Sequence, residues 1–144
     1  MILEKRIMGL DYGSTTIGVA VSDIMGLTAQ PVETIKINEV VNDFKIKRLK
    51  ELILEHNVGT VVLGLPMNMD FSEGERVEKT KIFAETFQRK IKNVELVYQD
   101  ERLTTMQAER VLLEADMSRG KRKKVIDKMA ATIILQTYLN KMNL

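Results

Sequence analysis

The spacing of hydrophobic residues changes along the chain, and each change predicts a separate element. Apolar residues alternate with small or polar ones, or run together briefly, in five segments that we expect to be β-strands: residues 7–10, 17–22, 28–37, 60–66 and 94–98. They recur every three or four positions in four segments that we expect to be helices: residues 42–57, 75–91, 104–115 and 126–138. Strands and helices in this succession predict an α/β protein.

Three local features bear on how these elements are arranged. The first three strands follow one another through short turns and predict an antiparallel meander. Pro31 puts the third strand at an edge, because proline cannot donate to a strand ladder. The strand over 60–66 is apolar on both faces, as parallel strands covered by helices tend to be. Ser72 and Glu75 have the spacing of a capping box for the helix that follows.

One carboxylate, Asp11, follows the first strand at the start of a turn. We expect Gly13 in this turn to adopt a positive φ, and the hydroxyls of Ser14 and Thr15 to lie near backbone N–H groups that can approach a phosphate. Asp11 is then placed to hold a divalent cation on that phosphate. The alternative is that Asp11 and Gly13 only shape a tight turn. A P-loop is excluded, because a strand follows where Lys and Ser or Thr should stand.

Length and composition limit what the chain can be. Its 144 residues, 44% hydrophobic and 29% charged, can bury one good core, so we expect a single domain over 1–144. The absence of cysteine excludes disulfides, thiolate metal ligands and a cysteine nucleophile. No apolar run approaches the length of a membrane span, and we expect a cytoplasmic monomer or weak homodimer. A net charge of +2 does not by itself indicate nucleic acid.

Acidic residues stand at the ends of elements in three places. They are Asp11 after the first strand, the pair Asp100 and Glu101 after the fifth, and Asp127 early in the last helix. Ligands gather beyond the carboxyl ends of strands in α/β sheets, so we expect the first two places to share one rim. Crowded carboxylates repel unless a cation intervenes, and oxygen ligands suit Mg²⁺ or Mn²⁺. Such ions can hold a scissile phosphate and generate hydroxide, which predicts phosphodiester hydrolysis.

Each acid also has a structural alternative. Asp100 could cap a turn, Glu101 could pair with Arg102 on the surface, and Asp127 could form an ion pair within its helix.

The only dense basic run in the sequence leads into the segment that carries Asp127. We expect residues 119–124 to form a loop that follows a phosphate backbone beside the acids, although a solvated charge run is the alternative. The aromatic content of 5% and the lack of tryptophan argue against base stacking, so recognition by backbone charge and shape is expected. The candidate contacts to nucleic acid are Ser14, Thr15, Arg102, Arg119, Lys121, Arg122, Lys123 and Lys124.

Several motifs, taken in order, resemble those of one protein family. They are Gly-Leu-Asp-Tyr-Gly at 9–13, Gly-Leu-Pro at 64–66, Asp-Glu-Arg-Leu-Thr-Thr at 100–105, Lys-Arg-Lys at 121–123, Asp-Lys-Met-Ala-Ala at 127–131 and Ile-Leu at 134–135. The family is YqgF, also called RuvX or the pre-16S rRNA nuclease family, and formerly grouped with Holliday junction resolvases. The resemblance covers nearly the whole chain.

The resemblance implies both a fold and a chemistry. The implied fold is ribonuclease H-like: a mixed five-stranded sheet in the order 3-2-1-4-5, with strand 2 antiparallel and helices on both faces. The implied chemistry is that of a nuclease dependent on Mg²⁺ or Mn²⁺, with a role in maturing the 5′ end of pre-16S ribosomal RNA. The acids that carry over by motif are Asp11, Asp100, Glu101 and Asp127.

One position departs from better-understood ribonuclease H-like nucleases. Those enzymes have an acid at the end of strand four, where this chain has Gly64, Leu65 and Pro66. The replacement must then come from strand five, which lies two strand spacings, about 10 Å, from strand one. Because side chains alternate along a strand, only one of Asp100 and Glu101 can face the site.

Three other functions remain open from the sequence. A Holliday junction resolvase, acting on DNA as a symmetric dimer, would use the same acids and cations. A non-catalytic nucleic-acid-binding module would fit the missing acid of strand four. One lobe of a sugar kinase or actin-like ATPase would share the phosphate hairpin, but 144 residues supply only one of the two lobes needed.

Overall fold

A five-stranded sheet forms the centre of the molecule. The computed structural model of the protein describes residues 3–66, 74–101 and 118–143, and for residues 122–128 it describes the backbone alone. The strands lie in the order β3-β2-β1-β4-β5. They are β1 (Arg6–Tyr12), β2 (Thr16–Ser22), β3 (Ala29–Lys36), β4 (Val58–Leu65) and β5 (Glu95–Asp100).

Only one of these strands runs against the others. β2 is antiparallel to β1 and to β3, whereas β4 is parallel to β1 and β5 is parallel to β4. The strand order, the single antiparallel strand and the edge position of β3, which carries Pro31, are confirmed.

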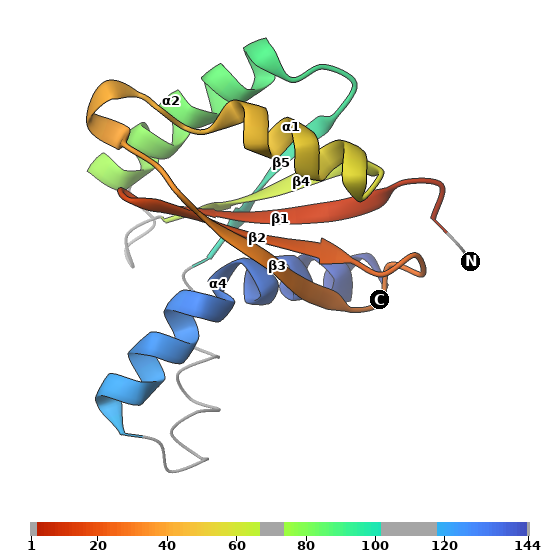
Figure 1. Cartoon of the computed structure of the whole chain (residues 1–144). Coiled ribbons are helices and arrows are strands. Elements are labelled where there is room, and N and C mark those ends of the chain that lie inside the picture. Colours follow the sequence, from red (N-terminus) through yellow and green to blue (C-terminus); the bar gives the residue numbers. More distant parts are fainter. Residues whose placement is uncertain (1–2, 67–73, 102–117, 144) are drawn as a thin grey trace.

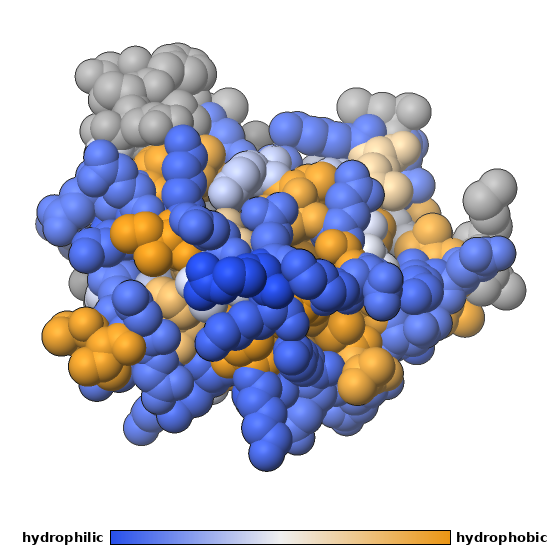
Figure 2. Space-filling view, turned by 90° about the horizontal axis from the view of Figure 1, so that it is seen from above, coloured by the Kyte–Doolittle hydropathy of each residue, from blue (hydrophilic) through white to orange (hydrophobic). Residues whose placement is uncertain are grey.

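Helices cover both faces of this sheet (Figure 1). α1 (Ile46–Glu55) and α2 (Glu75–Lys90) lie on one face, and α4 (Arg119–Met142) crosses the other. The face that carries α1 and α2 is mostly hydrophilic, with separate apolar patches (Figure 2). In the described part of the chain, no helix is both long and apolar enough to cross a membrane. The helix predicted over 104–115 lies outside the described residues.

The alternation of side chains along the strands divides the core into two layers. In β1, Met8, Leu10 and Tyr12 belong to the layer beneath α1 and α2, whereas Ile7 belongs to the layer beneath α4. Gly9 and Asp11 therefore face α4 with Ile7. The residues of α4 buried against this layer are Ala131, Ile134, Leu135 and Leu139.

Two glycines, Gly9 and Gly64, let α4 lie very close to the sheet. A methyl group on Gly9 would lie 2.7 Å from Cβ of Leu135, and one on Gly64 would lie 2.5 Å from Cδ1 of Ile134. At Gly18 a methyl group would meet Cβ of Ala131 at 3.5 Å, an ordinary contact. Gly9 and Gly64, which we call the glycine seam, are thus the positions at which α4 lies too close to β1 and β4 for an added side chain.

The end of β1 is anchored on the face opposite α4. The Tyr12 ring stacks on Phe83 of α2, with centroids 4.7 Å apart and an interplanar angle of 10°. The Tyr12 hydroxyl donates to Oε2 of Glu39 at 2.7 Å, and Arg76 donates to the other oxygen of Glu39 at 2.9 Å. Burial, together with the acceptor Glu39, raises the pKa of Tyr12 well above its ordinary value. The backbone beside Asp11 is thus fixed from behind.

Two helices begin at residues other than those expected. Asn42 and Lys45 both have φ of 54°, so the helix predicted from 42 begins only at Ile46, and Phe44 is buried without being helical. The 3₁₀ turn η1 (Glu39–Val41) precedes this segment. The N-cap of α2 is Gly74 rather than Ser72, which lies outside the described residues.

The basic run was wrongly expected to be a loop. It forms the first turns of α4, because the Ser118 side chain accepts a hydrogen bond from the Lys121 N–H at 3.3 Å and caps the helix there. Gly120 is part of this first turn.

Candidate active site

Asp11 lies near the end of β1 on the face that packs against α4. It is the next-to-last residue of the strand and pairs with Gly18 of β2. A methyl group on Gly18 would be 3.7 Å from Cβ of Asp11, which confirms that both positions face the same side. Asp11 is partly buried. Its carboxylate therefore stands at the rim where β1 ends, beside α4.

The turn after β1 differs from the expectation at one residue. The Gly13 N–H donates to the Thr16 carbonyl at 2.8 Å, and the Thr15 carbonyl accepts from the Ile37 N–H at 2.9 Å. Among the glycines that the structure describes, Gly26 is the one with a positive φ, so the prediction for Gly13 was wrong. These two hydrogen bonds close the turn without a left-handed residue at position 13. Ser14 and Thr15 are exposed at its tip.

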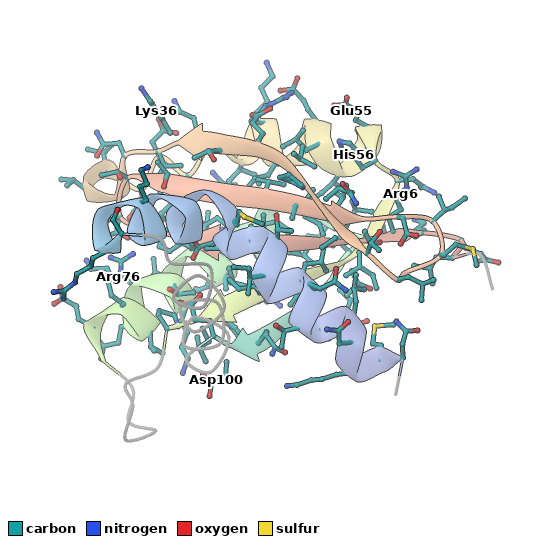
Figure 3. The ribbon with its side chains drawn as sticks, turned by 90° about the horizontal axis from the view of Figure 1, so that it is seen from below. Arg6, Lys36, Glu55, His56, Arg76 and Asp100 are labelled. Carbon is teal, nitrogen blue, oxygen red and sulfur yellow. The ribbon has the colours of Figure 1, made fainter. Side chains whose placement is uncertain are left out.

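Glu101, rather than Asp100, shares the face of Asp11. Val97 belongs to the layer beneath α4 and Leu96 to the opposite layer. Alternation along β5 therefore turns Glu101 towards α4 and Asp100 away from it. The Glu101 N–H donates to the Leu65 carbonyl at 3.3 Å, so the chain keeps its strand course for one residue past β5. Figure 3 shows α4 crossing the strands from below, with Asp100 on β5 at the edge of the sheet.

The Glu101 carboxyl occupies an electrostatically unfavourable place. Burial raises the pKa of Glu101 to about 7, and the negative charges of Asp11 and then Asp100 add to the effect. Its Oε2 atom lies 2.7 Å from the place that a methyl group on Gly64 would occupy. The carboxyl thus extends sideways over β4, from β5 towards β1.

The backbone position of Asp127 follows from the course of α4. In this helix Leu135 and Ala131 contact Gly9, and Ala131 also lies against Gly18, the partner of Asp11. Moving towards the carboxyl end of β1 therefore corresponds to moving towards the N-terminus of α4. The backbone of Asp127 lies one turn before Ala131 in this helix. The Asp127 side chain itself is outside the described part.

Some of the predicted nucleic-acid contacts lie on the first turns of α4. Arg119 and Lys121 are exposed there. These turns extend past the sheet at the rim where β1, β4 and β5 end (Figure 1). The side chains of Arg122, Lys123 and Lys124, and the whole of Arg102, are not described.

Two oxygen-donor groups thus converge at this rim, Asp11 and Glu101. Among the side chains that the structure describes, no three acids or histidines are grouped closely enough to hold a metal ion. The donor chemistry nevertheless fits a hard dication, because a buried carboxyl beside a second carboxylate gains from a cation between them. Asp127 is the candidate third ligand.

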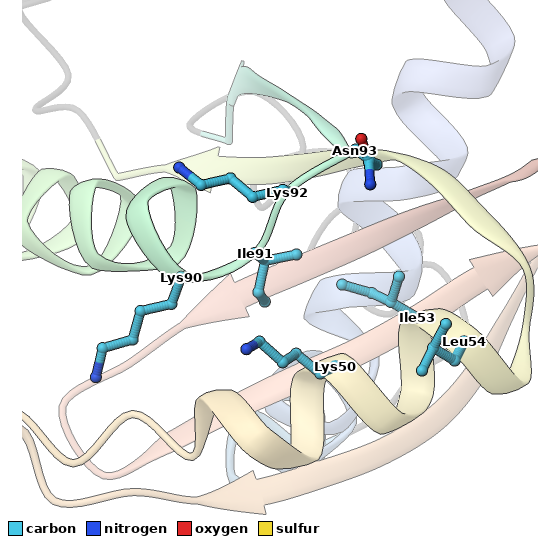
Figure 4. A pocket seen from close by; sticks show the side chains of 7 residues that line it. All are labelled: Lys50, Ile53, Leu54, Lys90, Ile91, Lys92 and Asn93. Carbon is cyan, nitrogen blue, oxygen red and sulfur yellow. The ribbon is translucent and has the colours of Figure 1, made fainter.

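A pocket elsewhere is not part of this site. It has a volume of about 320 Å³ and lies between the C-terminal parts of α1 and α2, at the beginning of β5 (Figure 4). Its floor is apolar and three lysines surround it; the lining residues are Lys50, Ile53, Leu54, Lys90, Ile91, Lys92 and Asn93. It therefore lies at the opposite end of β5 from Glu101.

Sequence reasoning missed two features of the site. It treated the segment Gly64, Leu65 and Pro66 only as the place of a missing acid, whereas Gly64 lies directly under the Glu101 carboxyl. It also missed the Tyr12–Glu39–Arg76 network, whose members are 27 and 37 residues apart in the chain and have no local signal. One sequence signal did indicate part of the site. Side chains alternate along strand five, so only one of Asp100 and Glu101 could face Asp11.

Comparisons with known proteins agree with this arrangement. The sequence model of a family described as RuvX, Holliday junction resolvase, matches residues 5–141. A Streptococcus thermophilus protein named "Putative pre-16S rRNA nuclease" is 58% identical over 138 residues, which cover 95% of this chain and 99% of the relative. A Staphylococcus aureus protein of the same name is 54% identical over 142 residues, which cover 99% of this chain and 100% of the relative.

A solved structure shares the fold. RuvC of T. thermophilus, in complex with a Holliday junction substrate, matches with a TM-score of 0.55 and 15% identity over 96% of each chain. The likeness at this level of identity concerns the fold alone, which is that of the ribonuclease H-like resolvases.

Proposed function

This chain belongs to the RuvX family and is a nuclease, and on that premise we propose that it is a metal-dependent endonuclease of structured RNA. The proposed reaction is phosphodiester hydrolysis at the 5′ end of pre-16S ribosomal RNA, in the cytoplasm. The relatives with 58% and 54% identity carry the name of that activity and support this choice of substrate.

A single observation carries the proposal of metal dependence. The carboxyl of Glu101 is held partly buried at the same rim as Asp11, with its pKa raised to about 7. The folded chain gains nothing from this arrangement by itself, since burial and like charge both oppose ionisation. Strained groups of this kind cluster at functional sites. A dication between the two carboxylates would remove the repulsion.

Three acids share one part in the proposed reaction, which is to hold the metal ion. Asp11, Glu101 and Asp127 would hold Mg²⁺ or Mn²⁺, which supplies a polarised phosphate and a water of lowered pKa. Asp11 is supplied by a strand whose end is fixed by the Tyr12 ring. Asp100 turns towards the opposite layer, and we propose no contact between it and the metal.

Cations and hydroxyls near the rim would bind the nucleic acid. Arg119 and Lys121, exposed on the first turns of α4, are suited to phosphate contacts that do not depend on base sequence. Ser14 and Thr15, exposed at the tip of the turn after β1, offer hydroxyls for the same purpose.

Cleavage assays with two substrates test the proposal. Purified protein with Mn²⁺ should cut an RNA that spans the 5′ end of pre-16S rRNA. Asp11→Asn and Glu101→Gln should abolish this cleavage while electrophoretic mobility shifts show that RNA binding persists. Asp100→Asn serves as the matched variant and should still cleave. Cleavage that survives Asp11→Asn, or that is lost only with Asp100→Asn, would contradict the assignment.

A second candidate function, Holliday junction resolution, is favoured by the description of the matching family. A four-way DNA junction of similar length, incubated under the same conditions, distinguishes the two. Cleavage of the junction alone would replace the RNA proposal with resolution of DNA.

A further inference from the structure

We propose that Gly64 is a positioning residue, whose missing side chain leaves the space through which Glu101 reaches across β4 to join Asp11. The inference rests on the proposed function for its purpose, but its geometry is independent of the substrate.

The distance between the two acids makes such a path necessary. Asp11 is on β1 and Glu101 follows β5, with β4 between them. Two strand spacings amount to about 10 Å between backbones. A carboxyl that stood straight up from the sheet at the end of β5 would stay at that distance. The Glu101 side chain must lean across β4 to share an ion with Asp11.

In the structure the Glu101 carboxyl lies over β4, at the position of Gly64. Gly64 is on the α4 face, since its neighbour Val62 belongs to the layer beneath α4 and side chains alternate. A methyl group on Gly64 would lie 2.7 Å from Oε2 of Glu101, closer than real Cβ atoms approach other heavy atoms. A side chain at position 64 would therefore displace this oxygen, and the flexible end of the Glu101 side chain would move to another place.

Backbone conformation does not explain this glycine. Gly64 is not among the described residues with a positive φ, so its backbone would accept any L-residue. What its position requires is empty space above the strand. This distinguishes Gly64 from Gly26, whose φ is 68°.

A second atom lies near the same space, and any test must distinguish its displacement from that of the Glu101 carboxylate. Cδ1 of Ile134 would lie 2.5 Å from a methyl group on Gly64, so Gly64→Ala alone would disturb α4 as well as Glu101. Ile134→Val removes that atom. In a protein that carries both changes, the Glu101 carboxylate is the remaining close contact.

The other glycine beside an acid provides a matched control. A methyl group on Gly18 would lie 3.5 Å from Cβ of Ala131 and 3.7 Å from Cβ of Asp11, which are ordinary contacts. Gly18→Ala thus adds the same group to the same face of the sheet without displacing a carboxylate.

The test measures Mn²⁺ binding by isothermal titration calorimetry in the absence of nucleic acid, with urea unfolding of each variant. Ile134→Val and Gly18→Ala should bind Mn²⁺ within about twofold of the unchanged protein. Gly64→Ala combined with Ile134→Val should bind about 10- to 100-fold more weakly, the loss usual when a ligand is misoriented. Its unfolding midpoint should stay close to that of Ile134→Val. Equal Mn²⁺ affinity in the double variant and in Ile134→Val would overturn the proposal.

A further variant tests the reach of the side chain without crowding. Glu101→Asp shortens the side chain by one methylene and should weaken Mn²⁺ binding to a similar extent, since its carboxylate would stop short of the space over Gly64. Unchanged affinity in Glu101→Asp would also overturn the proposal. If these affinities change as expected but no nucleic acid is cut, the proposed function fails and the role of Gly64 stands.

Discussion

Replacing Glu101 by glutamine should stabilise the metal-free protein at alkaline pH. In the folded chain the pKa of Glu101 is raised from 4.5 to about 7 by burial and by the charges of Asp11 and Asp100. A group whose folded pKa lies above its unfolded pKa favours folding less as pH rises from the lower value through the higher one. Above pH 7 the ionised carboxyl therefore opposes folding at full strength, and glutamine removes this penalty.

The size of the effect follows from the two pKa values. At about 1.4 kcal/mol per pH unit, the difference between 4.5 and about 7 amounts to about 3 kcal/mol at pH 8. At pH 5 the folded carboxyl is protonated and the same comparison gives less than about 1 kcal/mol. The stability advantage of the variant over the unchanged protein should therefore grow as the pH rises from 5 to 8.

Urea unfolding at pH 5 and at pH 8, with a chelator present, measures this difference. Glu95→Gln, at the exposed beginning of β5, is the control and should show a small difference at both pH values. Adding Mg²⁺ at pH 8 should stabilise the unchanged protein and leave Glu101→Gln unaffected. A stability gain in Glu101→Gln that is the same at pH 5 and pH 8 would refute the electrostatic reasoning.

Two further predictions concern the basic turns of α4 and the anchor behind Asp11. Arg119→Ala combined with Lys121→Ala should weaken nucleic-acid binding and lower the magnitude of the slope of log affinity against log salt by roughly 1.5–2. Fluorescence anisotropy at several salt concentrations measures this slope. An unchanged slope would show that neither residue contacts phosphate. Tyr12→Phe removes the hydrogen bond to Glu39 and should lower the free energy of unfolding by about 1–2 kcal/mol in urea. No loss in this variant would mean that water replaces the hydroxyl at Glu39.

Much of the sheet could be predicted because strand signals are local. Alternation in β2, a continuous apolar run in β4 and a proline at the edge of β3 each depend on a few neighbouring residues. The strand order came from the family resemblance and was confirmed. The predicted helix boundary was wrong where the backbone conformation does not follow the spacing of apolar residues. Phe44 has helical spacing with α1, but left-handed residues at 42 and 45 keep it out of the helix.

The site was predictable only to the level of candidates. Sequence alternation limits the strand-five pair to one member, but choosing Glu101 requires knowing that Val97 packs beneath α4. The role of Gly64 depends on Glu101 and on Ile134, which lie 37 and 70 positions further along the chain. Contacts between residues so far apart in the sequence produce no local pattern of apolar and polar residues. The helical state of the basic run is linked to the cap at Ser118, which lies just before the run.

The glycine seam has a consequence for protein engineering. Exchanging glycine for alanine is a standard way to raise thermal tolerance, since it restricts the unfolded chain where the native backbone permits. At Gly9 the added methyl would lie 2.7 Å from Cβ of Leu135 and 2.9 Å from the Ala131 carbonyl, so the exchange would push the helix off the sheet. A search for a heat-resistant version of this protein should therefore leave Gly9 and Gly64 unchanged and begin with exposed turns.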